Sequence, residues 1–208
     1  MSLKLDWCGQ RAAEFACNNY HYAKRIPHSK LVKIGVWEDE VFIGCVIFGY
    51  GANPNIGTPY GLTQYETCEL LRVALKEHKT TVTRIISISI GMLKKQSPGL
   101  KLIVSYADPD QGHVGKIYQA GNWVYVGLYN KGSMTAYVIN GEKRYTKTIG
   151  DKFRKYKGKE EIAPFEWVRK YLDPKATKFY TKGKHKYLMP LTNEMREQIG
   201  KLSKPYPR

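Results

Sequence analysis

Long apolar runs and paired cysteines, which mark membrane, secreted and zinc proteins, are missing from this chain. No run of about 18 apolar residues occurs, and the first ten residues, MSLKLDWCGQ, hold no signal-peptide core. The five histidines are dispersed, so a metal site is not supported by the sequence. We therefore expect a cytoplasmic protein with no segment inserted in a membrane. The four cysteines lack CxxC spacing, which favours buried free thiols over disulfides or zinc ligands: Cys8, Cys17, Cys45 and Cys68.

Acidic residues are also scarce, because 18 Asp and Glu face 34 Lys and Arg, for a net charge of +16. Such a field favours a polyanionic partner, with nucleic acid first and anionic membrane second. From Glu142 onward, 19 basic residues face 8 acidic ones, and Tyr145, Phe153 and Tyr156 lie among them. This mixture is typical of a surface that follows a nucleic-acid backbone and stacks on bases, with a solubilising tail as the alternative. The basic residues in question are Lys143, Arg144, Lys147, Lys152, Arg154, Lys155, Lys157, Lys159, Lys184 and Lys186.

The order of elements predicts an α/β fold with a mixed sheet. At 208 residues the chain can form one α/β domain, expected over residues 1–141, and a basic extension over residues 142–208 that packs back on the core. Apolar periodicity gives the elements. They are a helix over Arg11–Tyr22, a hairpin of Leu31–Trp37 with Val41–Tyr50, a strand over Thr67–Leu75, a helix over Thr83–Lys95, a strand from Leu102, a strand pair of Trp123–Tyr129 with Thr135–Ile139, a helix over Pro164–Tyr171 and an edge strand over Lys184–Thr192.

The stretch Leu102–Trp123 has the pattern of an active-site corner. An apolar run, which suits a strand buried on both faces, gives way to Ser105, Tyr106 and Asp108. Asp110 can then cap a helix that starts at Gln111 or Gly112 and carries Val114, Ile117 and Tyr118 on one stripe. A polar strand end that meets a helix N-terminus is the usual ligand site of open α/β sheets.

Two further places carry candidate functional residues. Glu69 and Arg72 lie inside an apolar strand, where odd spacing predicts opposite faces, and at least one is expected to point into a cleft. Structural partners elsewhere are an equally good explanation. The basic loop at residues 21–30, HYAKRIPHSK, reads first as a solvated connection. Its alternative role is substrate contact through stacking and phosphate binding by His21, Tyr22, Lys24 and Arg25.

Four blocks of sequence carry a resemblance to a known family. They are HYAKRIPHSKLVKIGVWEDEVFIGCVIFGYGANPN, YETCELLRVAL, SYADPDQGHVGKIYQAGNWVYVG and KHKYLMPLTNEM. In this order they resemble the Mom family of phage DNA-modification proteins. That resemblance implies a GNAT-like acyltransferase fold and conversion of adenine in DNA to its N6-carbamoylmethyl form, which shields phage DNA from host restriction. It also implies a phage or prophage protein in the host cytoplasm. The segment AGNW after Tyr118 is similar to the GF pair that follows a helix tyrosine in GNAT sequences.

One departure from the GNAT pattern concerns the group donor. GNAT enzymes that use acetyl-CoA hold its pyrophosphate on a glycine-rich turn, but the corresponding segment here, LKEHKTTVTR, has no glycine. The carbamoylmethyl group has the atoms of glycinamide. An activated glycine such as glycyl-tRNA is therefore favoured over acetyl-CoA, which makes double-stranded DNA and tRNA, or a CoA-type donor, the expected partners.

The resemblance also suggests roles for single residues. Asp108 or Glu69 would act as the base and Tyr118 as the acid, while Ser105, Tyr106 and the backbone near Gly112 and Gly115 would orient the donor and the oxyanion. His113 and Arg72 would contact the donor, and Tyr22, Tyr106 or Trp123 would stack on an adenine extruded from the duplex. The rival hypotheses are a nucleic-acid-binding protein with an inactive acyltransferase core and an acetyl-CoA-dependent transferase acting on another amine.

Overall fold

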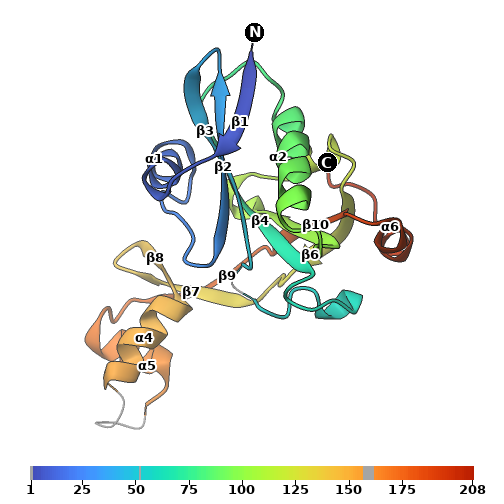
Figure 1. Ribbon diagram of the computed structural model, residues 1–208. Helices are drawn as coiled ribbons and strands as arrows, with labels where there is room; N and C mark the ends of the chain where they lie inside the picture. The colour runs from blue at the N-terminus through green and yellow to red at the C-terminus, as the bar shows by residue number, and fades with distance from the viewer. Residues whose placement is uncertain (1, 52, 157–161) are drawn as a thin grey trace. The chain divides into compact units, whose positions relative to one another are not determined.

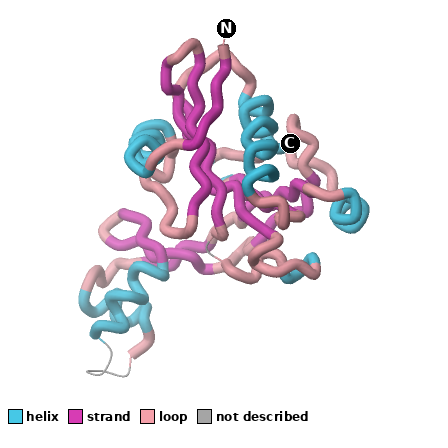
Figure 2. Tube along the Cα trace, in the orientation of Figure 1, coloured by secondary structure: helices cyan, strands magenta, loops and turns pink. Residues whose placement is uncertain are grey.

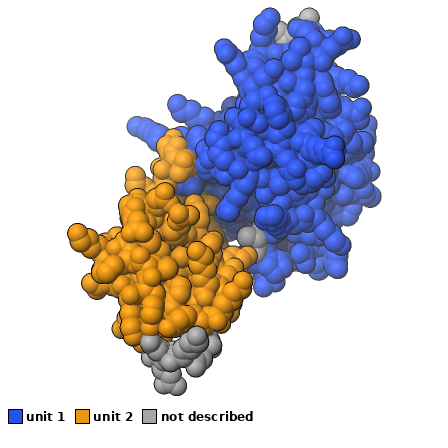
Figure 3. Space-filling model, turned by 90° about the vertical axis from the view of Figure 1, so that its left-hand side faces the viewer, with its two compact units in different colours: residues 1–108, 113–127, 185–208 blue, residues 109–112, 128–184 orange. Residues whose placement is uncertain are grey.

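The structure, a computed structural model, describes residues 2–51, 53–156 and 162–208. The predicted basic residues Lys157 and Lys159 lie outside these ranges. The chain forms two compact units, coloured separately in Figure 3. Unit 1 comprises residues 1–108, 113–127 and 185–208, and unit 2 comprises residues 109–112 and 128–184.

A seven-stranded mixed sheet forms the centre of unit 1. Strands β4 and β5 run parallel, whereas the pairs β1–β2, β2–β3, β3–β4 and β5–β10 are antiparallel. β5 is almost fully buried, as its apolar sequence predicts. The strand order is β1 (Leu3–Trp7), β2 (Leu31–Glu38), β3 (Val41–Gly49), β4 (Thr67–Leu75), β5 (Leu102–Ala107), β10 (Lys184–Pro190) and β6 (Val124–Tyr129).

Helices cover both faces of this sheet. α2 (Val82–Gln96) packs Ile85, Ile86 and Leu93 with Val46 and Ile103. α1 (Gln10–Tyr20) lies on the other side of the first strands, as Figure 1 shows. α6 (Asn193–Gly200) packs with Leu102 and Val104, whose side chains alternate with that of Ile103. α2 therefore covers one face and α1 and α6 the other. Within the described residues, no helix is both long and apolar enough to cross a bilayer.

Unit 2 has a three-stranded antiparallel sheet and two helices, seen in Figure 2. Its order is β8 (Glu142–Tyr145), β7 (Met134–Ile139) and β9 (Thr177–Tyr180). α4 (Thr146–Tyr156) and α5 (Pro164–Tyr171) cover one face, where Tyr137, Ile149 and Trp167 form a small core. The unit therefore has its own hydrophobic centre as well as its basic surface.

Several predicted elements are confirmed, and others are corrected. The hairpin of β2 and β3, the strand β4 and the helices α2 and α5 form where the sequence placed them. The predicted pairing of residues 123–129 with 135–139 is wrong, because β6 joins β10 and β7 joins β8 and β9. β10 is likewise no edge strand, since it lies between β5 and β6. These partners are distant in sequence, and a local pattern carries no information about them.

The predicted boundary between residues 141 and 142 falls inside a hairpin of unit 2. Ile139 pairs there with Glu142 across β7 and β8. The last part of the predicted extension, which includes β10 and α6, belongs to unit 1. The basic residues are therefore divided between both units. Unit 2 holds 15 Lys and Arg against 7 Asp and Glu, which is +8 of the total +16 in fewer than a third of the residues.

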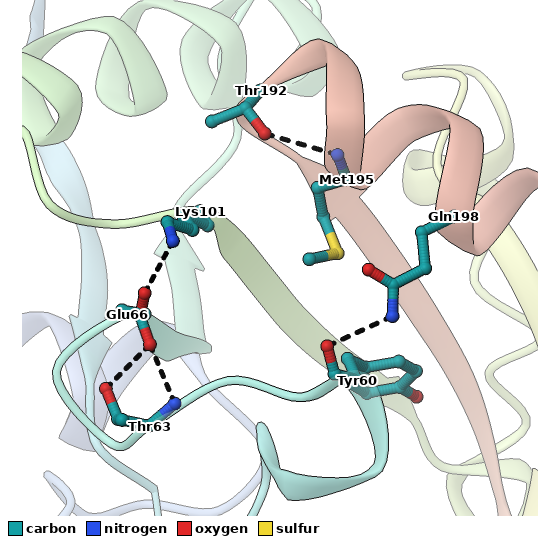
Figure 4. A network of polar contacts seen from close by, with 7 residues as sticks. All are labelled: Tyr60, Thr63, Glu66, Lys101, Thr192, Met195 and Gln198. Carbon is teal, nitrogen blue, oxygen red and sulfur yellow. Dashed lines mark hydrogen bonds and ion pairs between the residues drawn. The ribbon is translucent and has the colours of Figure 1, made fainter.

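The loop before β4 is fixed by a polar network, drawn in Figure 4. Glu66 pairs with Lys101 at 2.6 Å and accepts hydrogen bonds from the backbone N–H and the hydroxyl of Thr63, each 2.9 Å long. Gln198 of α6 donates to the Tyr60 carbonyl at 3.1 Å. These contacts tie residues 60–66 to β5 and α6, and so they define where β4 begins.

A buried carboxylate fixes the turn before α2. Glu38, at the end of β2, accepts hydrogen bonds from the backbone N–H groups of Lys79 (2.9 Å) and Thr80 (2.7 Å) and from the Thr80 hydroxyl (2.6 Å). These bonds lower the pKa of Glu38 from 4.5 to about 2. Two backbone N–H groups of the glycine-free segment LKEHKTTVTR thus bind a carboxylate of the protein itself.

We expect Glu38→Gln to lower the thermal unfolding midpoint by roughly 3–6 °C, because an amide accepts these bonds less strongly than a carboxylate. The stability that Glu38 supplies is present above its unfolded-state pKa and is lost as the pH falls through about 2. Melting curves between pH 7 and pH 2 measure both effects. Glu40→Gln, an exposed position two residues away, is the matched control and should leave the midpoint unchanged.

Candidate active site

The candidate site lies where β4 and β5 separate. The two strands pair in parallel from Thr67–Leu102 to Glu69–Val104, and both then continue beyond the paired segment. Parallel strands that part in the middle of a sheet leave backbone groups and side chains open to a ligand. The side chains at this point come from both strands and from the segments that flank them.

A β-bulge in β4 places Glu69 and Arg72 on the same face of the sheet, so the prediction of opposite faces is wrong. Glu69 pairs with Gly49 and Arg72 with Ile47, two positions of β3 that share a face. The register shifts between Ile47 and Phe48, where β4 has one extra residue. That residue reverses the alternation along β4, which spacing alone could not reveal.

Glu69 is half-buried, and its carboxylate lies close to Gly51 and Lys186. A Cβ added to Gly51, whose φ is +72°, would lie 2.2 Å from the Glu69 Oε2 atom. Burial lowers the pKa of Lys186, and the Glu69 carboxylate opposes this shift. Lys186 pairs with Tyr106 across β10 and β5, and its ammonium lies 5.0 Å from the ring centre of Tyr60. Glu69 is therefore close enough to Lys186 to influence its charge.

Arg72 supplies a cation with unused hydrogen-bonding capacity. One terminal nitrogen donates to the Leu71 carbonyl at 2.7 Å. The Nε atom is buried and has no hydrogen-bond partner among the described residues. A buried donor without an acceptor is unfavourable, so a ligand oxygen that reached this nitrogen would be stabilised.

His21, which follows α1, belongs to the basic loop whose predicted alternative role is substrate contact. Its pKa falls to about 4 because of burial, with added repulsion from Arg72 and His113. Its Nδ1 accepts the Ala23 N–H at 3.0 Å, so the proton of the neutral ring resides on Nε2. Tyr22 packs against His21 at 4.3 Å and against His113 at 5.6 Å between ring centres.

Ser105 and Tyr118 form a buried hydrogen-bonded chain. The Ser105 oxygen lies 3.0 Å from the Leu70 carbonyl and 2.8 Å from the Tyr118 oxygen. Because a carbonyl can only accept, Ser105 donates its proton to Leu70 and Tyr118 donates to Ser105. Burial raises the pKa of Tyr118 to about 12, with smaller contributions from Tyr22 and Glu69. Tyr118 therefore stays protonated, and its oxygen lies within electrostatic range of Glu69.

The loop after β5 differs from the predicted helix start. A 3₁₀ turn covers Pro109–Gln111, and α3 covers only Lys116–Gln119. Residue 108 is held by its carbonyl, which accepts the His113 N–H at 3.1 Å. The glycines Gly112 and Gly115 both have positive φ, and the proline and left-handed residues prevent an earlier helix.

The predicted catalytic residues divide between the two faces of β5. Ser105 shares the α2 face with Ile103, while Tyr106 shares the opposite face with Val104. Asp108 lies at the end of β5, next to the 3₁₀ turn. Tyr118 contacts Trp123 and Tyr187 at 5.1 Å between ring centres, which makes Trp123, fully buried, part of the core. Trp123 is therefore not available for the base stacking that was predicted for it.

The predicted DNA-contacting residues are mostly exposed. Lys24 and Arg25 lie in the loop after α1, and Tyr22 is half-exposed. In unit 2, Arg144 pairs with Glu142 and Arg154 with Asp151 on the surface. Exposed basic side chains are Lys143, Arg144, Lys152, Arg154, Lys155 and Lys184.

A cavity of about 430 Å³ opens between α1, the basic loop and β2. Ile26, Pro27, His28 and Ser29 contribute to its wall, and Lys33 donates to Gln10 at 3.0 Å on the opposite side. This volume is in the range of small-molecule sites. The loop is thus more than a flat solvated connection. Within the part of the chain that the structure describes, no cluster of three or more His, Cys, Asp or Glu side chains could hold a metal ion.

Comparison with known proteins identifies the family. The sequence profile of the Mom protein family matches residues 2–208. The chain belongs to the Mom family. The methylcarbamoylase Mom of Escherichia phage Mu is 28% identical to this chain over 126 residues, which are 59% of this chain and 51% of the phage Mu protein. The match thus spans about half the length of that relative.

Solved structures support an acetyltransferase fold for this Mom family member. The aminoglycoside acetyltransferase AAC(6')-Ib, in complex with coenzyme A and kanamycin, has a TM-score of 0.51 with 8% identity. The match covers 95% of this chain and 98% of that one. The same enzyme with coenzyme A alone gives the same values. At such low identity the likeness concerns the fold, and it confirms the α/β, GNAT-like expectation.

Proposed function

We propose that the protein converts adenine in DNA to N6-carbamoylmethyladenine and acts in the cytoplasm of a host cell, where the product protects phage DNA from restriction. The observation that carries the proposal is the family match over residues 2–208. The name of the phage Mu relative, the acyltransferase fold and the net charge of +16 support it. The enzymatic class is therefore a transferase.

The geometry suggests a role in the reaction for each of these side chains. Glu69 would take the proton from the adenine amine, with Asp108 as the alternative base. The Arg72 Nε–H, which has no acceptor among the described residues, and the Nε2–H of neutral His21 would meet the developing oxyanion. Tyr118 would act as the acid, and its pKa of about 12 keeps its proton available. Tyr22, half-exposed beside His21, would stack on the extruded base.

Acetyl-CoA fits the turn before α2 poorly. In GNAT enzymes the backbone N–H groups of this turn meet the pyrophosphate. Here the N–H groups of Lys79 and Thr80 already donate to the Glu38 carboxylate, and a second anion at this place would be repelled. An activated glycine, such as glycyl-tRNA, is therefore favoured as the donor.

The reaction with a glycyl ester balances in two stages. The adenine amine attacks the ester carbonyl, its proton passes to the base, and the ribose oxygen leaves with a proton from the acid. The product is N6-glycyladenine. The glycyl amine then attacks ring carbon C6 through a five-membered ring, and the bond from C6 to the original nitrogen breaks. That nitrogen becomes the terminal amide, so the rearrangement consumes no further reagent.

Mass spectrometry of DNA from cells that express the chain tests the proposal. We expect adenine carrying an added C2H3NO group, and adenine labelled with nitrogen-15 at N6 should deliver its label to the terminal amide. Unmodified DNA together with DNA binding would favour a binding protein with an inactive core. Tight coenzyme A binding by calorimetry, with acetylation of another amine, would favour an ordinary acetyltransferase.

A further inference from the structure

One face of the three-stranded sheet in unit 2 carries two aromatic rings on either side of a small residue. Tyr145 of β8 and Phe179 of β9 both pair with Ala136 of the central strand β7. Residues directly opposite one another in a sheet share a face. The row therefore reads aromatic, alanine, aromatic across the three strands.

This face is the one that the helices of unit 2 leave open. α4 and α5 pack on Tyr137 and Ile139, which alternate with Ala136 and Val138 along β7. Tyr145 is 50% exposed, and Phe179 is half-buried. The two rings are therefore not part of the small core of the unit.

The spacing of the row suits a planar group. Neighbouring strands lie about 4.8 Å apart, so two residues separated by one strand stand roughly 10 Å apart. A flat ring between two others needs about 3.5 Å on each side, or roughly 7 Å between the outer rings. Ala136 is fully buried beneath its neighbours, and because alanine is small, a planar group could lie above it once the Lys143 side chain moves away.

Lys143, in the next row of β8, points its cation into the same space. Its ammonium lies 3.6 Å from the ring centre of Phe179 and 5.5 Å from that of Tyr145. The side chain is long and exposed, so it can turn away when a ring enters, and its charge then suits a phosphate. Stacking of a base on an aromatic ring is stronger than an exposed cation–π contact.

We propose that Tyr145, Ala136 and Phe179 form a slot that holds an unstacked base of a DNA strand, with Lys143 moving to the adjacent phosphate. The inference rests on the proposed function, since it names the DNA contact of unit 2. The charge of unit 2, with 15 basic residues against 7 acidic ones, complements a DNA strand. The slot selects for a base that has left the duplex, because paired bases do not expose their faces.

Fluorescence anisotropy with labelled duplexes tests the slot. One duplex is fully paired, and the other carries an unpaired adenine. We expect Tyr145→Leu and Phe179→Leu each to weaken binding of the second duplex about 5- to 150-fold and to change binding of the first by less than twofold. Lys143→Met should weaken both. Tyr180→Leu is the matched control, because Tyr180 is 57% exposed on the same strand and points to the other face.

A spectroscopic signal separates stacking from loss of structure. When 2-aminopurine replaces the unpaired adenine, stacking should quench its fluorescence with the parent chain, with Tyr145→Phe and with Phe179→Tyr, but not with the leucine variants. Equal binding and equal quenching by the leucine variants would overturn the proposal. Preference for an RNA strand of the same sequence would overturn the assignment to DNA.

The outcome of the binding experiment can be distinguished from the outcome of the test of the proposed function. DNA that remains unmodified in cells while the slot binds would refute the modification and keep the slot. Modified DNA together with slot variants that bind as the parent does would refute the slot and keep the modification.

Discussion

Replacing Glu69 by glutamine should reduce adenine modification about 10²- to 10⁴-fold, the range expected when a general base is lost. Glutamine keeps the size of the side chain and its place beside Gly51 but cannot take a proton at neutral pH. The readout is the modified fraction of adenine in plasmid DNA from expressing cells. Glu40→Gln is the control, because Glu40 is an exposed carboxylate in the turn between β2 and β3.

The position of Glu69 can be tested without changing the residue itself. Gly51 and Gly61 both have left-handed backbones, with φ of +72° and +70°. A Cβ at Gly51 would meet the Glu69 carboxylate at 2.2 Å, whereas a Cβ at Gly61 would meet nothing within 4 Å. Gly51→Ala should therefore lower modification strongly by displacing the carboxylate, and Gly61→Ala should not. The two variants should unfold at similar temperatures, since both carry the same backbone strain.

Normal modification by Glu69→Gln would remove this residue from the mechanism. A loss confined to Asp108→Asn would move the role of base to Asp108. If Gly51→Ala and Gly61→Ala were equally active, the carboxylate would not need its observed position.

The largest effect on folding is expected for Gly115→Ala. Gly115 has φ of +86°, and an added Cβ would lie 2.4 Å from the ring of Tyr187, which is fully buried. Tyr187 is held by hydrogen bonds with the Val114 carbonyl and Gln119, and by contact with Tyr118. The left-handed alanine and the overpacked ring together cost about 2–5 kcal/mol.

Thermal melting measures this loss as a fall of roughly 5–15 °C in the midpoint. Gly112→Ala is the matched control, because Gly112 has φ of +74° and open space around its Cα. It should lose only the backbone contribution of about 1–2 kcal/mol. Equal melting temperatures for the two variants would show that the ring of Tyr187 can move, contrary to its packing.

The sequence predicted those elements whose own residues set their form. α2 follows from its apolar stripe, and the hairpin of β2 and β3 follows from the acidic turn between its strands. Glu69 and Arg72 were predicted from their charges inside an apolar strand, and the resemblance added Tyr118; in the structure Glu69 influences the pKa of Tyr118, and Arg72 influences that of His21. Each of these predictions depended only on a short segment of the sequence.

What the sequence did not predict depends on contacts between distant segments. The face of Arg72 is set by a bulge opposite β3, and the place of β10 is set by two strands far away in the chain. The importance of His21 arises from burial and from the cation of Arg72, which no local pattern reveals. The role of Glu38 likewise requires the turn at Lys79 and Thr80 to return to the end of β2.

The placement of β10 beside β6 has a consequence for how such proteins diversify. Nearly all of unit 2 is inserted between these two neighbouring strands of one sheet. The inserted module can therefore be exchanged through two junctions, and under the proposed function such an exchange would change the preferred DNA target without replacing the candidate active site of unit 1.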